Sequence, residues 1–138
     1  MATREDARVA VVTAVEALKA TWAPYPLLVE YDNRIAVNRA TQSNPFLCVR
    51  IKYMGGEQLA LGQNGGHRLM GMIELEANVK QGQGSKQAND LLQHFYPTLH
   101  QTDAFPPVRT YAARFTSKPP KEGWDNEVAL IPFWFDVL

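Results

Sequence analysis

Two runs of alternating side chains constrain the fold more than any other feature of this sequence. In residues 45–53, Leu47, Val49 and Ile51 alternate with Phe46, Cys48, Arg50 and Lys52, and residues 68–80 repeat the pattern. Side chains of a β-strand point alternately to two faces, so each run predicts a strand with one buried and one wetter face. Between them, the glycine-rich residues 55–66 suit a long, mobile hairpin tip. The two runs therefore predict an antiparallel pair, and the tip is a plausible contact arm.

Two segments have helical spacing of their apolar residues. Thr3 precedes two acidic residues and an apolar stripe, which predicts a helix that begins there and ends before Pro24. A second stripe follows Ser85, which has the chemistry of an N-cap. We expect that helix to run to about Tyr96 and to end at Pro97.

Three further segments have strand character, and together with the helices they indicate the fold class. These are residues 27–31, 108–116 and 127–137, the last two joined by a hydrophilic connection over residues 117–126. The resulting order is α-β-β-β-α-β-β, without repeated βαβ units. We predict an α+β fold in which residues 1–138 form a single two-layer domain. Its antiparallel (mixed) sheet carries both helices on one face.

The composition excludes several classes of protein. The 138 residues contain 46% hydrophobic residues, and 14 Lys and Arg balance 14 Asp and Glu. Zero net charge disfavours nucleic acid as a specific ligand. No uninterrupted apolar run approaches the roughly 20 residues of a membrane-spanning helix. The N-terminal residues lack the apolar core of a signal peptide, which predicts a chain made in the cytoplasm.

The histidines and the cysteine do not form a convincing catalytic set. His94 and His100 are six residues apart, a spacing that does not bring two ligands to one side of a metal ion. Cys48 could pair with His67 across the hairpin, but no nucleophile signature surrounds it, so we predict a packing residue. Asp90 and His94 are spaced as a solvated surface pair.

Two other features invite a chemical role and have a simpler explanation. Glu74 and Glu76 share the wetter face of their strand, so we expect exposed carboxylates that serve solubility or an interface salt bridge. The turn at residues 82–86 lacks the spacing of a nucleotide-binding loop, so we expect a structural turn. We therefore predict that the protein is not an enzyme and binds no metal or cofactor.

Apolar residues outside the expected core indicate an interface. Pro132 cannot donate a ladder hydrogen bond, which places the apolar final strand at an edge or a bulge, where a partner subunit would cover it. Simple burial in the core is the alternative for this segment. The candidate interface residues are Leu59, Leu61, Met70, Met72, Trp124, Leu130 and Trp134.

The order of these segments resembles the tail-terminator family of long-tailed bacteriophages. The resemblance covers nearly the whole chain and is one of arrangement, with no sharp motif. The segments that carry it are REDARVAVVTAVEALKATW, NPFLCVRIKY, the glycine-rich hairpin leading into HRLMGMIELEANVK, QANDLLQHFYP, VRTYAARF and EGWDNEVALIPFWFDVL.

The resemblance implies a structural protein of the virion. Such a protein forms a six-membered ring at the head-proximal end of the tail tube, stops tube polymerisation and provides the attachment surface for the neck. The implied partners are other copies of the chain, the tail tube protein and a neck or head-completion protein. Two alternatives stay open: another neck, head-tail joining or minor tail protein, and a small cytosolic α+β ligand-binding module.

Overall fold

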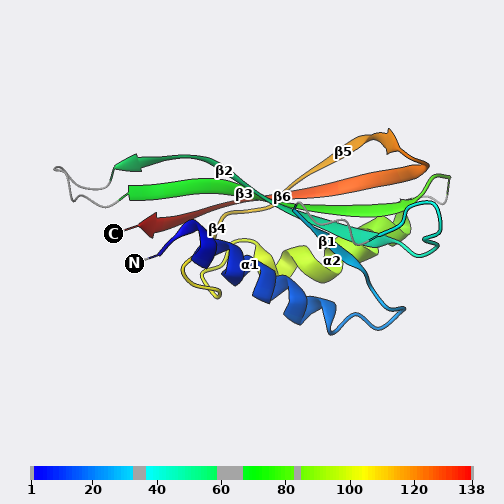
Figure 1. The fold of residues 1–138 in the computed structure, drawn as a ribbon, viewed down its shortest axis with the longest axis horizontal. Helices are drawn as coiled ribbons and strands as arrows, with labels where there is room; N and C mark the ends of the chain where they lie inside the picture. The colour runs from blue at the N-terminus through cyan, green and yellow to red at the C-terminus, as the bar shows by residue number, and fades with distance from the viewer. Residues whose placement is uncertain (1, 33–36, 59–66, 83–84, 138) are drawn as a thin grey trace.

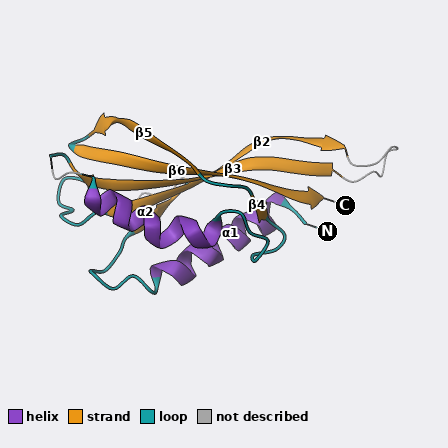
Figure 2. Ribbon diagram, turned by 180° about the vertical axis from the view of Figure 1, so that it is seen from behind, coloured by secondary structure: helices purple, strands orange, loops and turns teal. Residues whose placement is uncertain are grey.

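The computed structural model describes residues 2–32, 37–58, 67–82 and 85–137. Six strands form one sheet in the order β1-β2-β3-β6-β4, and β5 also pairs with β6. β1 is parallel to β2, and every other pairing is antiparallel. Both helices cover the same face of the sheet (Figures 1 and 2), which confirms the predicted α+β, two-layer architecture. The elements are α1 (Arg4–Lys19), β1 (Val29–Tyr31), β2 (Phe46–Gln58), β3 (His67–Lys80), α2 (Lys86–Leu99), β4 (Arg109–Thr110), β5 (Arg114–Lys121) and β6 (Trp124–Val137).

Helix α1 begins where the sequence predicts it. The Thr3 hydroxyl accepts the Asp6 amide hydrogen bond, and the Asp6 carboxylate accepts one from the Thr3 amide. This capping box satisfies two otherwise free donors at the start of the helix. None of the described helices is long and apolar enough to cross a membrane.

Helix α2 differs from the prediction at both ends. Ser85 stands at the N-cap position but its side chain makes no capping hydrogen bond. The predicted stop at Pro97 is wrong, because the helix continues through Leu99 with Pro97 inside its last turn. The proline removes one hydrogen bond there, whereas the fully buried Leu99 side chain favours the extra turn.

The C-terminal third contains more strand than predicted. The expected strand over residues 108–116 is divided into β4 and β5, and most of the expected connection over residues 117–126 belongs to β5 and β6. The reversal is only the step at Glu122 and Gly123, both with positive φ (55° and 83°). Positive φ at both central residues is what a two-residue hairpin turn requires.

Strand β6 is internal, so the prediction of an edge position from Pro132 is wrong. The Pro132 carbonyl accepts a hydrogen bond from the Tyr111 amide at 2.8 Å. Because the N and C=O groups of one strand residue point to the same side, the Pro132 nitrogen also faces the side of β6 on which Tyr111 lies. On that side β5 pairs with β6 up to Leu130, and β4 begins at Phe133. The missing donor therefore lies at the gap between β5 and β4, where no ladder bond is lost.

The β2–β3 hairpin is longer than predicted. The expected antiparallel pairing is confirmed, and it extends to Gln58 opposite His67, so residues 55–58 belong to the strand. The register shifts between Tyr53 and Gly55, which is a β-bulge. Residues 59–66 of the predicted tip lie outside the described part of the chain.

The core fills the space between the sheet and the helices. It includes residues of β2, β3 and β6 at alternate positions, among them Val49, Ile73 and Phe133, packed against Val11 of α1 and Phe95 of α2. A smaller cluster of Val37, Phe46, Cys48 and Trp124 lies apart from it. Burial is therefore not confined to the helix side of the sheet.

Replacement of Gly71 by alanine tests the packing at the centre of the sheet. A Cβ there would lie against the backbone oxygen of Lys52 and 2.5 Å from Cζ of Phe133, so we expect a loss of about 2–3 kcal/mol in unfolding free energy. Urea denaturation measures it. As a control, Gly123→Asn places its Cβ in open space, and asparagine tolerates positive φ, so it costs less than about 1 kcal/mol. Equal losses for the two variants would contradict this packing.

Candidate functional site

The candidate site lies on the face of the sheet opposite the helices, which we call the bare face. Odd-numbered residues of β3, such as Ile73 and Leu75, belong to the core beneath the helices. Successive strand side chains alternate, so the even-numbered residues of β3 point to the bare face. The register then pairs Met70 with Trp134 and Met72 with Pro132 on this face.

An apolar patch occupies the part of the bare face near the C-terminus. It comprises Met70, Met72, Leu130, Pro132 and Trp134, which the register of β3 and β6 brings to adjacent positions. The Met70 side chain is 38% exposed, and the other four are partly exposed. Four of the predicted interface residues therefore come together although up to 64 positions separate them in the sequence.

Arginines surround the indole at the centre of this patch. The Arg68 guanidinium lies 3.7 Å from the centroid of the Trp134 ring, and that of Arg109 lies 5.1 Å from it. Arg68 also pairs with Asp136, with Nε and Oδ1 3.0 Å apart. The patch thus has an apolar centre and a mainly cationic rim, which orients the Trp134 ring.

Trp124, another predicted interface residue, lies away from this patch. Trp124 is only 2% exposed, because its ring packs on Phe46 with centroids 4.9 Å apart and its indole N–H donates to the Arg39 carbonyl. Trp124 is therefore a packing residue in the isolated subunit. Leu59 and Leu61 lie outside the described residues.

Next to the apolar patch, the bare face contains a buried ionic network. Glu74 and Glu76 are 1% and 6% exposed, so the prediction of exposed carboxylates is wrong. Lys118 of β5 contacts both carboxylates, at 3.2 Å from Glu76 Oε2. Arg50 Nη1 lies 2.9 Å from Glu76 Oε2, and Lys52 Nζ lies 3.1 Å from Glu74 Oε2. The opposite charges on the predicted strand pair β2 and β3 could have indicated ion pairs between them. The contribution of Lys118 from β5 could not be seen in the sequence.

The protonation states of Glu74 and of the nearby Cys48 follow from their burial and from the charges around them. Burial raises the pKa of the Glu74 carboxyl, but hydrogen bonds from Lys118 and Lys52 outweigh it, so the pKa lies below its ordinary value. Burial, together with the nearby Glu76 and Glu30, raises the pKa of the Cys48 thiol to about 12. Cys48 is therefore a neutral thiol near neutral pH, unsuited to nucleophilic chemistry.

The hypothetical pair of Cys48 and His67 does not form. Cys48 is paired with Glu76 and His67 with Gln58, so the two positions are nine residues apart along β3. At about 3.3 Å a residue, that separation is about 30 Å.

The His94 imidazole has structural contacts. His94 Nε2 lies 2.8 Å from the Leu18 carbonyl and 2.9 Å from the Thr21 hydroxyl, and so ties α2 to the end of α1. Asp90 pairs with Lys86, so the expected pair with His94 is not formed. Within the described ranges, no group of three His, Cys, Asp or Glu residues could hold a metal ion.

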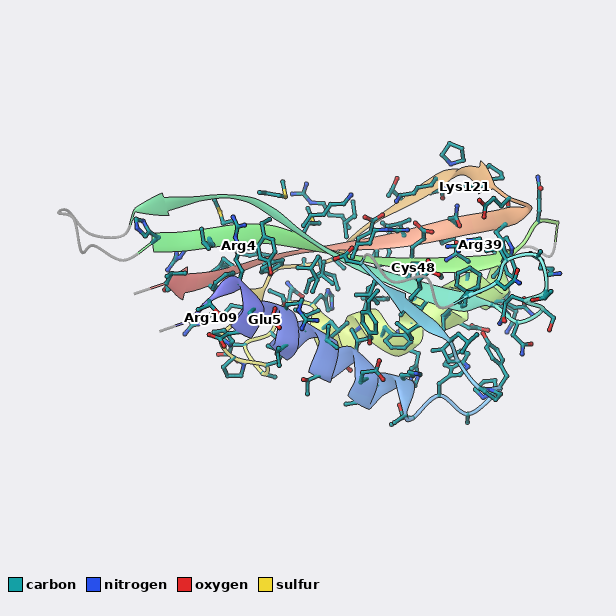
Figure 3. The ribbon with its side chains drawn as sticks, viewed as in Figure 1. Arg4, Glu5, Arg39, Cys48, Arg109 and Lys121 are labelled. Carbon is teal, nitrogen blue, oxygen red and sulfur yellow. The ribbon has the colours of Figure 1, made fainter. Side chains whose placement is uncertain are left out.

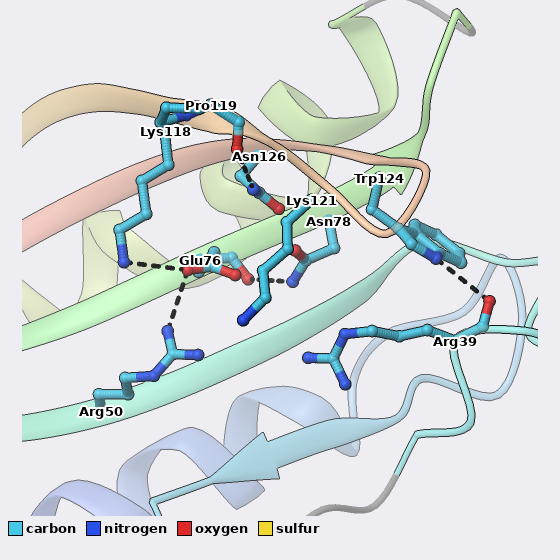
Figure 4. A pocket seen from close by; sticks show the side chains of 9 residues that line it. All are labelled: Arg39, Arg50, Glu76, Asn78, Lys118, Pro119, Lys121, Trp124 and Asn126. Carbon is cyan, nitrogen blue, oxygen red and sulfur yellow. Dashed lines mark hydrogen bonds and ion pairs between the residues drawn. The ribbon is translucent and has the colours of Figure 1, made fainter.

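A cavity of about 300 Å³ opens at the end of the bare face away from the C-terminus. Arg39, Cys48 and Lys121 lie at this end of the sheet, and Arg109 at the other (Figure 3). The cavity has contributions from β2, β3, the β5–β6 hairpin and the loop that carries Arg39 (Figure 4), and we call it the cationic pocket. Its charged lining residues are Arg39, Arg50, Lys118, Lys121 and Glu76.

Comparisons with known proteins inform the fold. No family model and no curated protein matches the chain. One solved structure, whose name states no function, aligns with 100% of this chain and 97% of its own, with a TM-score of 0.63 and 16% identity. At that identity, the likeness shows a shared fold.

Replacing Glu74 by glutamine tests the ionic network. Because the folded-state pKa of Glu74 is lowered, its carboxylate stabilises the fold at pH values above the ordinary pKa of 4.5. That stabilisation is lost as the pH falls through the folded-state pKa. We expect Glu74→Gln to cost about 2 kcal/mol near pH 7 and much less near pH 3. Urea denaturation at both pH values measures the difference.

The control for this test is Glu127→Gln on the neighbouring strand. Glu127 accepts a hydrogen bond from the exposed Ser117 hydroxyl, so its replacement costs less than about 0.5 kcal/mol at either pH. A loss for Glu74→Gln that is the same at both pH values would show that its charge does not stabilise the fold.

Proposed function

We propose that this protein is a structural subunit of a bacteriophage tail that acts as a tail terminator. In this proposal six copies form a ring at the head-proximal end of the tail tube, stop its polymerisation and provide the surface to which the neck attaches. The chain is made in the cytoplasm of the host and assembles into the virion. The proposal assigns it no catalytic residue, metal or cofactor.

The apolar patch is the observation that carries this proposal. Protein interfaces combine an apolar centre with a polar rim and are enriched in Trp, Met and Arg. Met70, Met72 and Trp134 form such a centre, with Arg68 and Arg109 beside the indole. An exposed face of this composition supports a role in assembly.

The edge of the sheet at β5 favours contact with a partner through the bare face and not through addition of a strand. The outer edge of β5 carries Lys118, Pro119, Pro120 and Lys121, all exposed. Pro119 and Pro120 have no amide donor and the exposed Lys121 remains solvated, so they oppose addition of another strand at this edge. A closed ring repeats one contact between two different surfaces of each subunit. The bare face supplies one of them in this proposal.

The main alternative is another neck, head-tail joining or minor tail protein, which would use the same patch. The two differ in what loss of the protein does to the particle. Without a terminator, tubes grow beyond their normal length, whereas without a joining protein tails of normal length remain separate from heads. Electron microscopy of lysates after deletion of the gene distinguishes these outcomes, and normal, joined particles would contradict both.

Charge placed in the apolar patch tests the contact surface. We expect Met70→Asp and Trp134→Asp, supplied to the deletion strain, to lower the yield of infectious particles more than about tenfold, because a carboxylate in an apolar interface is costly to desolvate. The matched control is Leu28→Asp, since Leu28 and Met70 are both 38% exposed.

Wild-type protein should also be found in a ring of about 93 kDa, from six subunits of 15.5 kDa.

Circular dichroism and thermal unfolding must first show that each aspartate variant folds. Folded patch variants that give normal numbers of joined, normal-length tails would contradict the assignment of the interface. Loss of assembly in Leu28→Asp to the same extent would show that the effect is not specific to the patch.

A further inference from the structure

We propose that the cationic pocket binds the carboxylate side chain of an acidic peptide segment from a partner protein. This inference does not rest on the proposed function, because the pocket lies apart from the apolar patch and its lining alone carries the argument. Four cationic side chains, from three different parts of the fold, surround the cavity: Arg39, Arg50, Lys118 and Lys121.

Contacts within the protein hold two of these cations in place. The Arg39 guanidinium lies 5.1 Å from the centroid of the Phe46 ring and 3.0 Å from Glu30 Oε1, and the Arg39 carbonyl accepts the Trp124 indole hydrogen bond. Arg50 is held by Glu76 at 2.9 Å. Ligand binding therefore requires little ordering of these side chains, which lowers its entropic cost.

Lys121 differs from the other cations of the pocket. Within the described part of the chain it makes no ion pair, and Figure 4 shows its side chain reaching into the space between Arg50 and Arg39. The Lys121 ammonium group and the guanidinium groups of Arg39 and Arg50 line the same cavity, and like charges repel one another. An anion placed among the three would relieve that repulsion.

The charges around the pocket favour a singly charged anion. Among the described residues, the charged residues that line the pocket and those connected to them by ion pairs comprise five cations and four carboxylates, which leaves one positive charge in excess in this network. A carboxylate matches that excess, whereas a phosphate dianion exceeds it and would be repelled by Glu76 inside the pocket. The cations are Arg39, Arg50, Lys52, Lys118 and Lys121, and the anions are Glu30, Glu74, Glu76 and Glu122.

Two buried amides make a peptide a better fit than a small free acid. The Asn78 and Asn126 side chains line the pocket, and their Nδ2 groups donate to Cys48 Sγ and to the Pro119 carbonyl. Neither Oδ1 atom accepts a hydrogen bond from another described residue. These two acceptors suit the amide N–H groups that flank a glutamate or aspartate in a peptide.

NMR titration of the whole protein tests the site with the blocked peptide acetyl-Ala-Glu-Ala-amide. We expect saturable shifts of the Trp124 indole N–H and of the Asn78 and Asn126 side-chain amides, while the Trp134 indole does not move. The matched peptide with glutamine should bind at least about tenfold more weakly, since it lacks the charge. Inorganic phosphate at equal ionic strength should bind more weakly than the glutamate peptide.

Variants of Lys121 tie the binding to this pocket. Lys121 is exposed, so Lys121→Gln leaves the fold intact, and we expect it to weaken binding of the glutamate peptide about fivefold. Lys121→Arg keeps the charge and should bind within about twofold of wild type. The control Lys86→Gln removes the same charge from a distant helix and should change nothing.

Several results would overturn the proposal. Equal binding of the glutamine peptide would show that the carboxylate is not recognised, and tighter binding of phosphate would assign the pocket to a different anion. Absence of saturable shifts at millimolar peptide, or an unchanged affinity in Lys121→Gln, would show that the pocket is not the site.

Discussion

The antiparallel ladder between β3 and β6 is the constraint on which the rest of the structure depends. Fourteen residues of β3 pair with fourteen of β6 without a register shift. Because strand side chains alternate, this register sends Ile73 and Ile131 to the core and Met70 and Trp134 to the bare face. A slip of one residue would exchange the two faces, burying the arginine-rimmed patch beneath the helices and exposing the core.

The bare face has two chemically different parts because β6 has two different partners along its length. Beside β5, up to Leu130, Lys118 reaches Glu74 and Glu76 and completes a buried ionic network. Beyond the gap at Pro132, the shorter β4 leaves Trp134 partly exposed between arginines. The apolar patch and the cationic pocket thus follow from where β5 ends.

Local sequence signals predicted the elements that depend on local interactions. The Thr3 cap, the alternation of β3 and the α+β class all follow from residues close together in the chain. The grouping of Met70 with Trp134 needed the register of two strands, although both residues were already candidates. The sequence does not predict that helix α2 continues past Pro97, because burial of Leu99, a tertiary effect, outweighs one lost hydrogen bond.

The pocket and the ionic network could not be predicted in the same way. Glu74 and Lys118 are 44 positions apart, and Arg39 and Trp124 are 85 apart, so no local pattern joins them. The missing donor of Pro132 is visible in the sequence and predicts an edge strand, whereas the gap between β4 and β5 that accommodates it is visible only in the structure.

A cryo-EM reconstruction of the assembled particle tests the central proposal, that the bare face is where this protein meets its partners. We expect Met70, Met72 and Trp134 to be covered by a neighbouring chain. A particle in which this face is open to solvent, and contacts are made only through α1 and α2, would contradict it.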